Sequence, residues 1–464
     1  MVKRAKKRAK NESLLGSMFT LICEHQIGLS VNLLLLLFLS HLMFPRIRWR
    51  TQKFFHLSYY NEESGMYTSG IDDLSYVAFW IVVFTGLRAG VMDYILHPLA
   101  SLGGINRHRD VVRFVEQAWL IVYYSVIWPM GMYIVYNSSY WFNLREMWTD
   151  WPIAQMDGLF KWYYLVQFAF WLQQILVVNI EERRKDYAQY LAHHIITSAL
   201  MFMSYGYYQM RVGTVILSCM DVVDIILSAA KMLKYLGYSS ICDYAFGLFM
   251  ATWVVARHGF YLSICWSLYA HTPTSLPAAC YNSDTGVMLA PSDAGYEKNG
   301  GTEIWKNILQ TYIDPHGPVC WNANIEWSFM ALLFALQLIT LLWFALIVKV
   351  AWKVVNGEAA DDVRSDDEGD DEEEEIEVEE YSDPKHTIPS PSKAKANMAM
   401  EGVPLEEEVG VESLTFVRRN SPGVLNYKRS STGRGGGNRS SGISIPGHGD
   451  RKELLGRIGC DKPS

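Results

Sequence analysis

Charged residues are scarce in this sequence, and cysteines are scarcer. Only 19% of the 464 residues are Asp, Glu, Lys or Arg, and seven are cysteines. So few cysteines in a chain of this length exclude a secreted scaffold held together by disulfides. Acidic residues outnumber basic ones by 48 to 41, which excludes a nucleic-acid binder built on a basic domain. No internal repeat and no soluble catalytic domain is recognisable.

The acidic excess lies entirely at the carboxyl end. Residues 356–464 hold 24 Asp/Glu and 14 Lys/Arg, whereas the preceding 355 residues hold 24 and 27. Because the dense acidic run 361–380 has almost nothing with which to form a core, we predict a disordered acidic tail over 355–464. Ser365 stands directly before three acidic residues, a setting that suits an acidophilic kinase. A solvated tail without a phosphorylation switch is the alternative.

What the rest of the chain has in abundance is long apolar runs, several of them near the roughly 20 residues that cross a bilayer. The fold class that these runs predict is all-α, a polytopic membrane helix bundle. The first run contains LLLLLFL and is typical of a signal anchor, since no cleavable signal pattern precedes it. We predict about eight transmembrane helices, at 28–44, 74–96, 117–136, 159–179, 190–211, 213–235, 241–268 and 327–348.

Positive charge in the short loops predicts the orientation. The first ten residues contain six Lys/Arg, which places the amino terminus in the cytosol, and Arg107 and Arg109 follow two spans later on the same side. Four basic residues after the first span argue weakly against this topology. Both termini are therefore expected to be cytosolic, with domains at 1–27 (basic amino terminus), 28–106 (first two spans), 107–354 and 355–464.

Two features belong to the predicted lumenal loops. The sequon at Asn137 permits a glycan, although its closeness to a span end argues against its use. Cys280 and Cys320 share the loop 269–326, where either a disulfide or two free thiols fits the sequence.

Ionisable residues inside predicted spans are costly and point to function. The fifth span opens with His193 and His194, and the sixth carries Asp221 and Asp224. The two aspartates are three apart, so we expect them to share a helix face and to point into one cavity. The adjacent histidines diverge by about 100° around the axis, so both can border a cavity but at different angles. A carboxylate beside an imidazole fixes its tautomer and raises its basicity.

A metal site is the alternative for these four residues, because two His and two Asp could ligate one ion. Membrane di-iron enzymes, however, need several His-rich boxes, and only one pair among the 12 histidines is clustered. We therefore expect no metal.

The stretch 183–235 resembles the Lag motif of ceramide synthases, within the TLC membrane domain. The double histidine, the D-x-x-D pattern about 27 residues later and Lys231 follow one another in the order of that motif. Met220 before Asp221 gives the pattern M-D-x-x-D, which resembles the fungal branch of the family. The resemblance covers about 107–354 and implies a TLC-type bundle that encloses an intramembrane cavity. Further matching positions are Arg184, Lys185, Asp186, Ser204, Tyr205, Arg211, Gly213, Tyr235, Trp253 and Arg257.

The resemblance implies a sphingoid base N-acyltransferase of the endoplasmic reticulum membrane. A long-chain or very-long-chain acyl-CoA would acylate dihydrosphingosine or phytosphingosine to give a ceramide, with no cofactor, because acyl-CoA is a substrate. By the same resemblance the catalytic residues are His193, His194, Asp221 and Asp224. The substrate-binding residues are Arg184, Lys185, Lys231, Arg257, Trp253, Tyr205 and Arg211.

Two mechanisms stay open. A histidine acts as general base while the amine attacks the thioester, or it first forms an acyl-imidazole that the amine resolves. We favour the second, with His193 or His194 as nucleophile. A non-catalytic TLC-type protein (translocon-associated or lipid-sensing) and a transporter are the rival functions. The resemblance also implies a small single-span subunit, for which the loop 269–326 offers a landing site, and a homodimer or heterodimer, but no nucleic acid.

Overall fold

The computed structural model describes residues 24–180, 186–282, 285–314 and 316–356, all within the first of two units of the chain, 1–382. Ser365 and the acidic tail therefore lie outside the described residues. The helices are α2 (Gln26–Met43), α3 (Arg48–Phe55), α4 (Asp72–Val91), α5 (His97–Leu102), α6 (His108–Tyr136), α7 (Gly158–Ile180), α8 (Tyr187–Gly206), α9 (Met210–Tyr235), α10 (Ser239–Trp253), α11 (Tyr261–Ser275), α12 (Gly295–Lys298), α13 (Ile304–Ile313) and α14 (Ala323–Val355). Short helical segments are η1 (Pro45–Ile47), η2 (Met92–Leu96), η3 (Glu146–Trp148) and η4 (Val254–Phe260), and the strands are β1 (Tyr60–Asn61), β2 (Met66–Tyr67), β3 (Ala279–Tyr281), β4 (Met288–Leu289) and β5 (Val319–Trp321).

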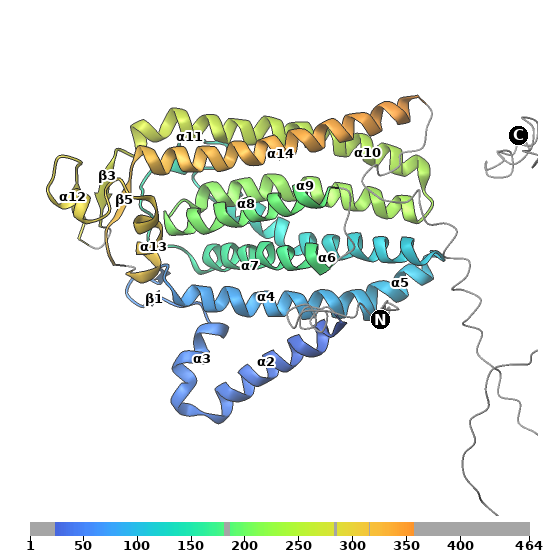
Figure 1. Ribbon diagram of the computed structural model, residues 1–464, viewed down its shortest axis with the longest axis horizontal. Helices are drawn as coiled ribbons and strands as arrows, with labels where there is room; N and C mark the ends of the chain where they lie inside the picture. The colour runs from blue at the N-terminus through green and yellow to red at the C-terminus, as the bar shows by residue number, and fades with distance from the viewer. Residues whose placement is uncertain (1–23, 181–185, 283–284, 315, 357–464) are drawn as a thin grey trace, which may run out of the picture. The chain divides into compact units, whose positions relative to one another are not determined.

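Among the described residues, seven helical runs are long and apolar enough to cross a membrane. They are α2, α4–η2–α5, α6, α7, α9, α10–η4–α11 and α14, and the long ones lie side by side in Figure 1. The all-α membrane bundle is thus confirmed. The fifth predicted span, 190–211, forms α8, which lies among these helices but is not one of the seven. Its Tyr, Gln and His residues keep its mean hydropathy below the level that the seven spans reach.

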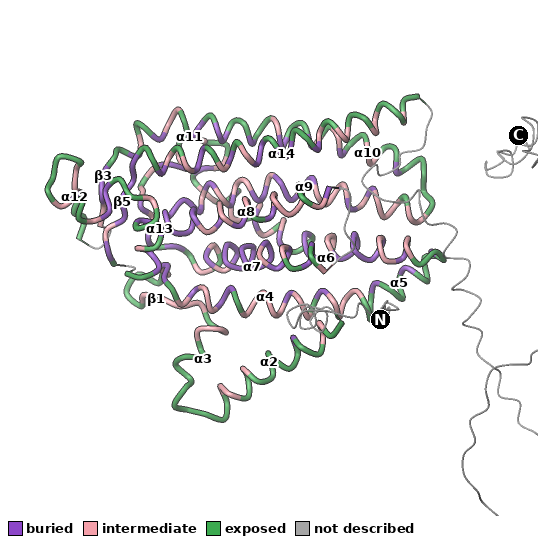
Figure 2. The backbone as a smooth tube through the Cα atoms, in the orientation of Figure 1, coloured by how far each residue is buried: buried purple, intermediate pink, exposed green. Residues whose placement is uncertain are grey.

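Burial shows which helices form the interior. In the most apolar window of α7, 72% of the residues are buried, against 6% for α2. Figure 2 shows the same contrast, with α7 largely purple and the α2–α3 hairpin largely green. Most exposed side chains of α2 are large and apolar, chiefly leucines together with Val31, Phe38 and Met43, which suit contact with lipid. α7 is therefore the helix around which the others pack.

One end of the bundle carries a small folded segment, 276–322, which we call the cap. Its strands form an antiparallel sheet in the order β4-β3-β5, in which Cys280 lies opposite Cys320. These two cysteines form a disulfide, which decides between the two alternatives left by the sequence. The region predicted as a long loop is thus a folded element.

The cap holds the end of α8 in place. Thr311 and Tyr312 of α13 donate hydrogen bonds to the carbonyls of Gly206 (2.6 Å) and Phe202 (3.1 Å). A Cβ at Gly206 would lie 2.8 Å from the Ile308 carbonyl oxygen, so only glycine permits this approach. The carboxyl end of α8 is thereby fixed, and its first turns lie toward the other end of the bundle.

A buried ion pair links α4, α7 and α8 near the capped end. Lys161 Nζ lies 2.7 Å from Asp73 Oδ1, and both side chains are fully buried. The ammonium also donates to the carbonyls of Ser58 and Thr68, while the Tyr205 hydroxyl donates to Asp73 Oδ2 at 2.7 Å. Such a pair is maintained when further groups compensate the two charges; here hydrogen bonds reach the ammonium and Asp73 Oδ2, while Asp73 Oδ1 makes the ion pair.

Candidate active site

A buried polar cavity lies between α4, α6, α7, α8, α9, η4 and α14. His193 and His194 line it from α8, and Asp224 and Lys231 line it from α9. The two histidines are close to the start of α8, so the cavity lies away from the capped end. Its other lining residues are Arg88, Glu116, Gln117, Trp119, Leu120, Tyr124, Phe170, Trp171, Gln174, Val177, Tyr190, Leu227, Ser228, Trp253, Arg257 and Trp343.

The two imidazoles enter the cavity at different angles, as their adjacent positions predict. Their ring centroids are 5.5 Å apart and the rings are perpendicular. The Trp171 ring of α7 contacts both, at 5.4 Å from His193 and 5.2 Å from His194, while Trp343 of α14 lies 5.2 Å from His193. Packing against two tryptophans limits the rotation of both imidazoles.

Hydrogen bonding distinguishes the two histidines. His194 Nδ1 lies 2.8 Å from the carbonyl oxygen of Tyr190, one helical turn earlier. Since a carbonyl only accepts, this nitrogen carries the proton and a neutral His194 keeps a lone pair on Nε2. His193 Nδ1, in contrast, is buried with no hydrogen-bond partner within the described part of the chain. The fold therefore fixes the tautomer of His194 alone.

Asp224 is held by a cation from the neighbouring helical run. Arg257 Nη2 donates to Asp224 Oδ1 at 2.9 Å, and the guanidinium lies 4.4 Å from the centroid of the Trp253 ring. Arg257 belongs to the π-helical segment η4, a type of local widening often found at functional sites. All three residues line the cavity.

Asp221 does not line the cavity, which corrects the expectation that both aspartates point into it. Its side chain is fully buried, and its Oδ2 accepts from Gln167 Nε2 at 3.0 Å. The carbonyl of that amide accepts from the Tyr123 hydroxyl at 2.7 Å. Positions three apart differ by about 60° around a helix axis, enough to place Asp221 against α7 and α6 while Asp224 faces the cavity.

The other predicted substrate-binding residues divide into three groups. Lys231, Arg257 and Trp253 line the cavity, whereas Arg184 and Lys185 lie outside the described residues. Tyr205 does not reach the cavity, because it lies 11 residues beyond His194, about 16 Å along the helix, and binds Asp73. Arg211 does not reach it either, because its guanidinium donates to the carbonyls of Glu146 and Thr149 near the capped end.

Several lining residues were missed by the sequence analysis. Glu116 and Gln117 come from α6, and Gln174 comes from α7. The signal was present in 108–136, where positions 116, 117, 120 and 124 all line the cavity from one helix face. The polar residues of that face, Glu116 and Gln117, follow closely after Arg107 and Arg109, which were interpreted only as markers of membrane orientation.

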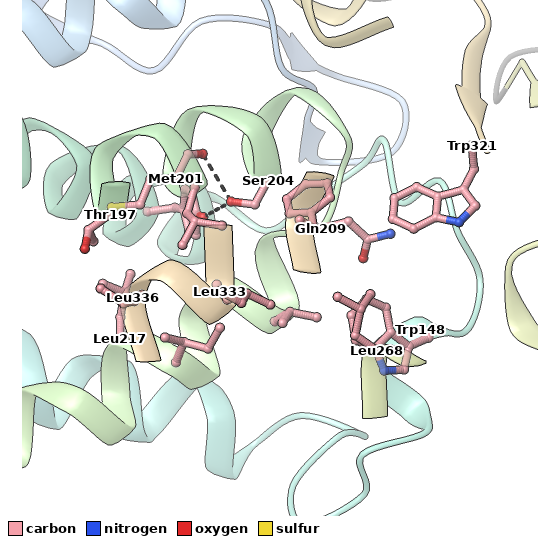
Figure 3. Close-up of a pocket in the computed structure, with 16 residues that line it drawn as sticks. Trp148, Thr197, Met201, Ser204, Gln209, Leu217, Leu268, Trp321, Leu333 and Leu336 are labelled. Atoms are coloured by element: carbon pink, nitrogen blue, oxygen red, sulfur yellow. Dashed lines mark hydrogen bonds between the residues drawn. The ribbon is translucent and has the colours of Figure 1, made fainter. Parts of the chain in front are cut away.

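A second cavity begins one turn further along α8 and is almost entirely apolar. Figure 3 shows its lining side chains, which come from α8, α9, α11 and α14, with Trp148 and Trp321 at one side. Thr197, Leu200 and Met201 line it on the helix that carries the histidines. The polar and the apolar cavity therefore succeed each other along α8 toward the capped end.

In the described ranges, no group of three or more His, Cys, Asp or Glu side chains is arranged to hold a metal ion.

Comparison with known proteins identifies the family of this bundle. The model of the family described as the TLC domain matches residues 113–349. This range contains both histidines, both aspartates and most of the cavity wall. The chain belongs to the TLC-domain family.

Three of the curated relatives that the chain resembles are fungal proteins. A sphingosine N-acyltransferase-like protein of Alternaria alternata is 49% identical over 345 residues, which are 74% of this chain and 76% of the relative. A ceramide synthase of Gibberella moniliformis is 40% identical, over 71% of this chain and 75% of its own. A sphingosine N-acyltransferase of Schizosaccharomyces pombe is 39% identical, over 76% and 81%. The TLC domain and the seven apolar helices make this a multi-pass membrane protein.

Proposed function

We infer that this protein is a ceramide synthase, an enzyme that transfers a long or very long acyl chain from acyl-CoA to the amine of a sphingoid base. The observation that carries this function is the polar cavity itself. It places two imidazoles and the carboxylate of Asp224 together inside a membrane bundle. The names of the fungal relatives support the same activity and not a non-catalytic role.

His194 is best prepared to react first. Its Nε2 lone pair is set by the Nδ1 hydrogen bond to Tyr190, so the nitrogen is available as a nucleophile. We propose that Nε2 attacks the thioester carbonyl carbon, that the carbon–sulfur bond breaks and that coenzyme A leaves as the thiolate. The amine of the base then attacks the acyl-imidazole, the carbon–nitrogen bond of the amide forms, and the imidazole regains its lone pair.

His193 and Asp224 support the second step in this proposal. The attacking amine must lose a proton, and the neutral imidazole of His193, which lies against His194, is suited to accept it. Arg257 holds Asp224 in a fixed position in the same cavity. The Asp224 carboxylate then stabilises the transient positive charge on the amine or on the imidazole. A direct transfer with histidine as general base remains the competing mechanism.

The apolar cavity is suited to the acyl chain. It begins at Thr197, one turn after His193, and continues along α8 as far as Ser204, ten residues beyond His194, or about 15 Å. A chain whose carbonyl lies at the histidines would thus enter an apolar space toward the capped end. Trp148 and Trp321 stand at the far side of this space, where a bulky side chain limits how long a chain fits.

We further propose residence in the endoplasmic reticulum membrane, with α8 crossing the bilayer beside the seven apolar runs, so that the even number of crossings leaves both termini in the cytosol. The histidine end of the bundle then faces cytosolic acyl-CoA. The cap then lies in the lumen, where a disulfide is stable. The cap offers a folded surface to which a small single-span subunit could bind. We also propose that the synthase itself forms a homodimer or a heterodimer.

Two assays test the function. The purified protein with a mixture of acyl-CoAs and both bases should yield ceramides detected by mass spectrometry, and no amide product from any pair would refute the activity. With acyl-CoA alone, peptide mapping should find the acyl group on His194. An unmodified enzyme that still makes ceramide would favour direct transfer.

A further inference from the structure

The polar cavity has a second functional region, formed by Glu116, Gln117 and Gln174, that the acyl-transfer mechanism does not use. All three side chains are more than nine-tenths buried, and all three line the same cavity as the histidines. Glu116 and Gln117 are adjacent on α6, whereas Gln174 comes from α7. Glu116 lies close to the basic Arg113, whose Nη1 is 3.1 Å from its Oε2.

Gln117 is the informative member of this group. Its side chain is only 6% exposed, yet across the described ranges its amide makes no hydrogen bond. Its amide atoms are not among the fully buried polar atoms that lack a partner, so they are reached from the cavity. An amide that lines a cavity under these conditions calls for a ligand that both donates and accepts hydrogen bonds.

The position of Gln174 connects this group to the reacting centre. Gln174 lies three residues after Trp171, whose ring contacts both imidazoles, so the two α7 positions are about 4.5 Å apart along the axis. Gln174 Nε2 donates a hydrogen bond to Gln173 Oε1 at 3.3 Å. The side-chain oxygen of Gln174 is then the atom that can accept a hydrogen bond from a ligand. A ligand held by these residues would lie within one helical turn of the histidine pair.

The chemistry of the group favours a polyhydroxylated amine over a phosphate. Amide side chains match hydroxyl groups, because both partners donate and accept. The carboxylate of Glu116 is already paired with Arg113, so this pair adds little net charge and leaves the two amides as the main recognition groups. Arg88 and Lys231, which could bind phosphates, line the cavity from α4 and α9 instead.

We propose that Gln117, together with Gln174 and Glu116, binds the head group of the sphingoid base, with Gln117 hydrogen-bonded to one of its hydroxyls. This assignment rests on the proposed function. All three residues line the cavity and none takes part in the proposed acyl transfer, so we expect this site to affect which base is accepted rather than how the acyl group moves.

The test uses the full-length protein with Gln117→Met, which keeps the length of the side chain and removes its hydrogen bonds. With dihydrosphingosine we expect kcat/KM to fall about five- to tenfold, the effect of one hydrogen bond. With the analogue that lacks the contacted hydroxyl, at C1 or at C3, the variant should equal the wild type. The KM for acyl-CoA and the acylation of the enzyme by acyl-CoA alone should not change.

Gln337→Met is the matched control, because Gln337 is equally buried in a spanning helix, binds His258 and does not line the cavity. If Gln117→Met loses the same factor on every base, or raises the KM for acyl-CoA, the proposal is overturned. Should Gln117→Met not fold, Gln117→Asn, which keeps the amide and shortens its reach, must show the same hydroxyl-dependent loss. A wild type that acylates no base at all would refute the proposed function and this assignment with it, whereas an active wild type with an unaltered Gln117→Met variant would refute this assignment alone.

Discussion

Removing the carboxylate of Asp224 should destabilise the protein as well as inactivate it. The Asp224–Arg257 distance is 2.9 Å, and the Arg257 side chain is only 4% exposed. At an effective dielectric constant of about 20, two unit charges at that distance attract by about 6 kcal/mol before desolvation is subtracted. Asp224→Ala leaves the guanidinium buried beside Trp253 without this partner.

The expected loss follows from what remains behind. Breaking a buried pair by removing one partner typically costs about 3–5 kcal/mol. Because the Asp224 side chain is 29% exposed to the cavity, screening places the expected loss at the lower end, about 3 kcal/mol. Replacing both partners, with Asp224→Ala and Arg257→Met, removes the stranded charge and should recover most of that stability.

The assay compares thermal unfolding midpoints in detergent with ceramide formation in membranes. Asp224→Ala should lower the midpoint by several degrees, and the double variant should return close to the wild-type midpoint. Activity should stay low in both, because the cavity has lost its carboxylate. An Asp224→Ala protein as stable as the wild type, or a double variant with full activity, would refute this reasoning.

Three further predictions concern the rest of the bundle. Asp73→Ala strands the buried charge of Lys161 and should cost about 3–5 kcal/mol of stability, measured by thermal unfolding, while folded protein keeps its KM values. Met201→Trp narrows the apolar cavity and should shift the ceramide products toward shorter acyl chains by mass spectrometry; unchanged chain lengths would exclude the cavity as the acyl site. Cys280→Ser opens a loop of 40 residues and should lower the stability by about 4 kcal/mol, an effect that reducing agent must reproduce in the wild type but not in the variant.

The histidine pair illustrates what the sequence could predict. Adjacent positions on a helix diverge by about 100°, and the structure has both rings in the cavity and perpendicular to each other. The apolar runs likewise predicted the membrane bundle. A long hydrophobic segment in a bilayer must satisfy its backbone hydrogen bonds within itself, and a helix does so. Both predictions depended on local pattern alone.

The predicted and observed side-chain positions differ where contacts with neighbouring helices determine the direction of a side chain. Asp221 and Asp224 belong to one helix, but Gln167 of α7 draws Asp221 away from the cavity. Tyr205 lies within the same motif as the histidines, yet about three turns of helix separate it from His194. Gln117 reaches the cavity only because α6 packs against α7 and α9, a tertiary arrangement that one sequence does not specify.

The most direct test of the account is the rate of ceramide formation by the wild type and by His193→Ala, His194→Ala and the double variant, each checked for folding by its unfolding midpoint. Loss of the reacting imidazole should lower the rate of His194→Ala by about 10²–10⁴-fold, with a smaller fall for His193→Ala and no further loss in the double variant beyond that of His194→Ala. A folded double variant that makes ceramide at a rate within a few-fold of the wild type would contradict the claim that this cavity performs the transfer.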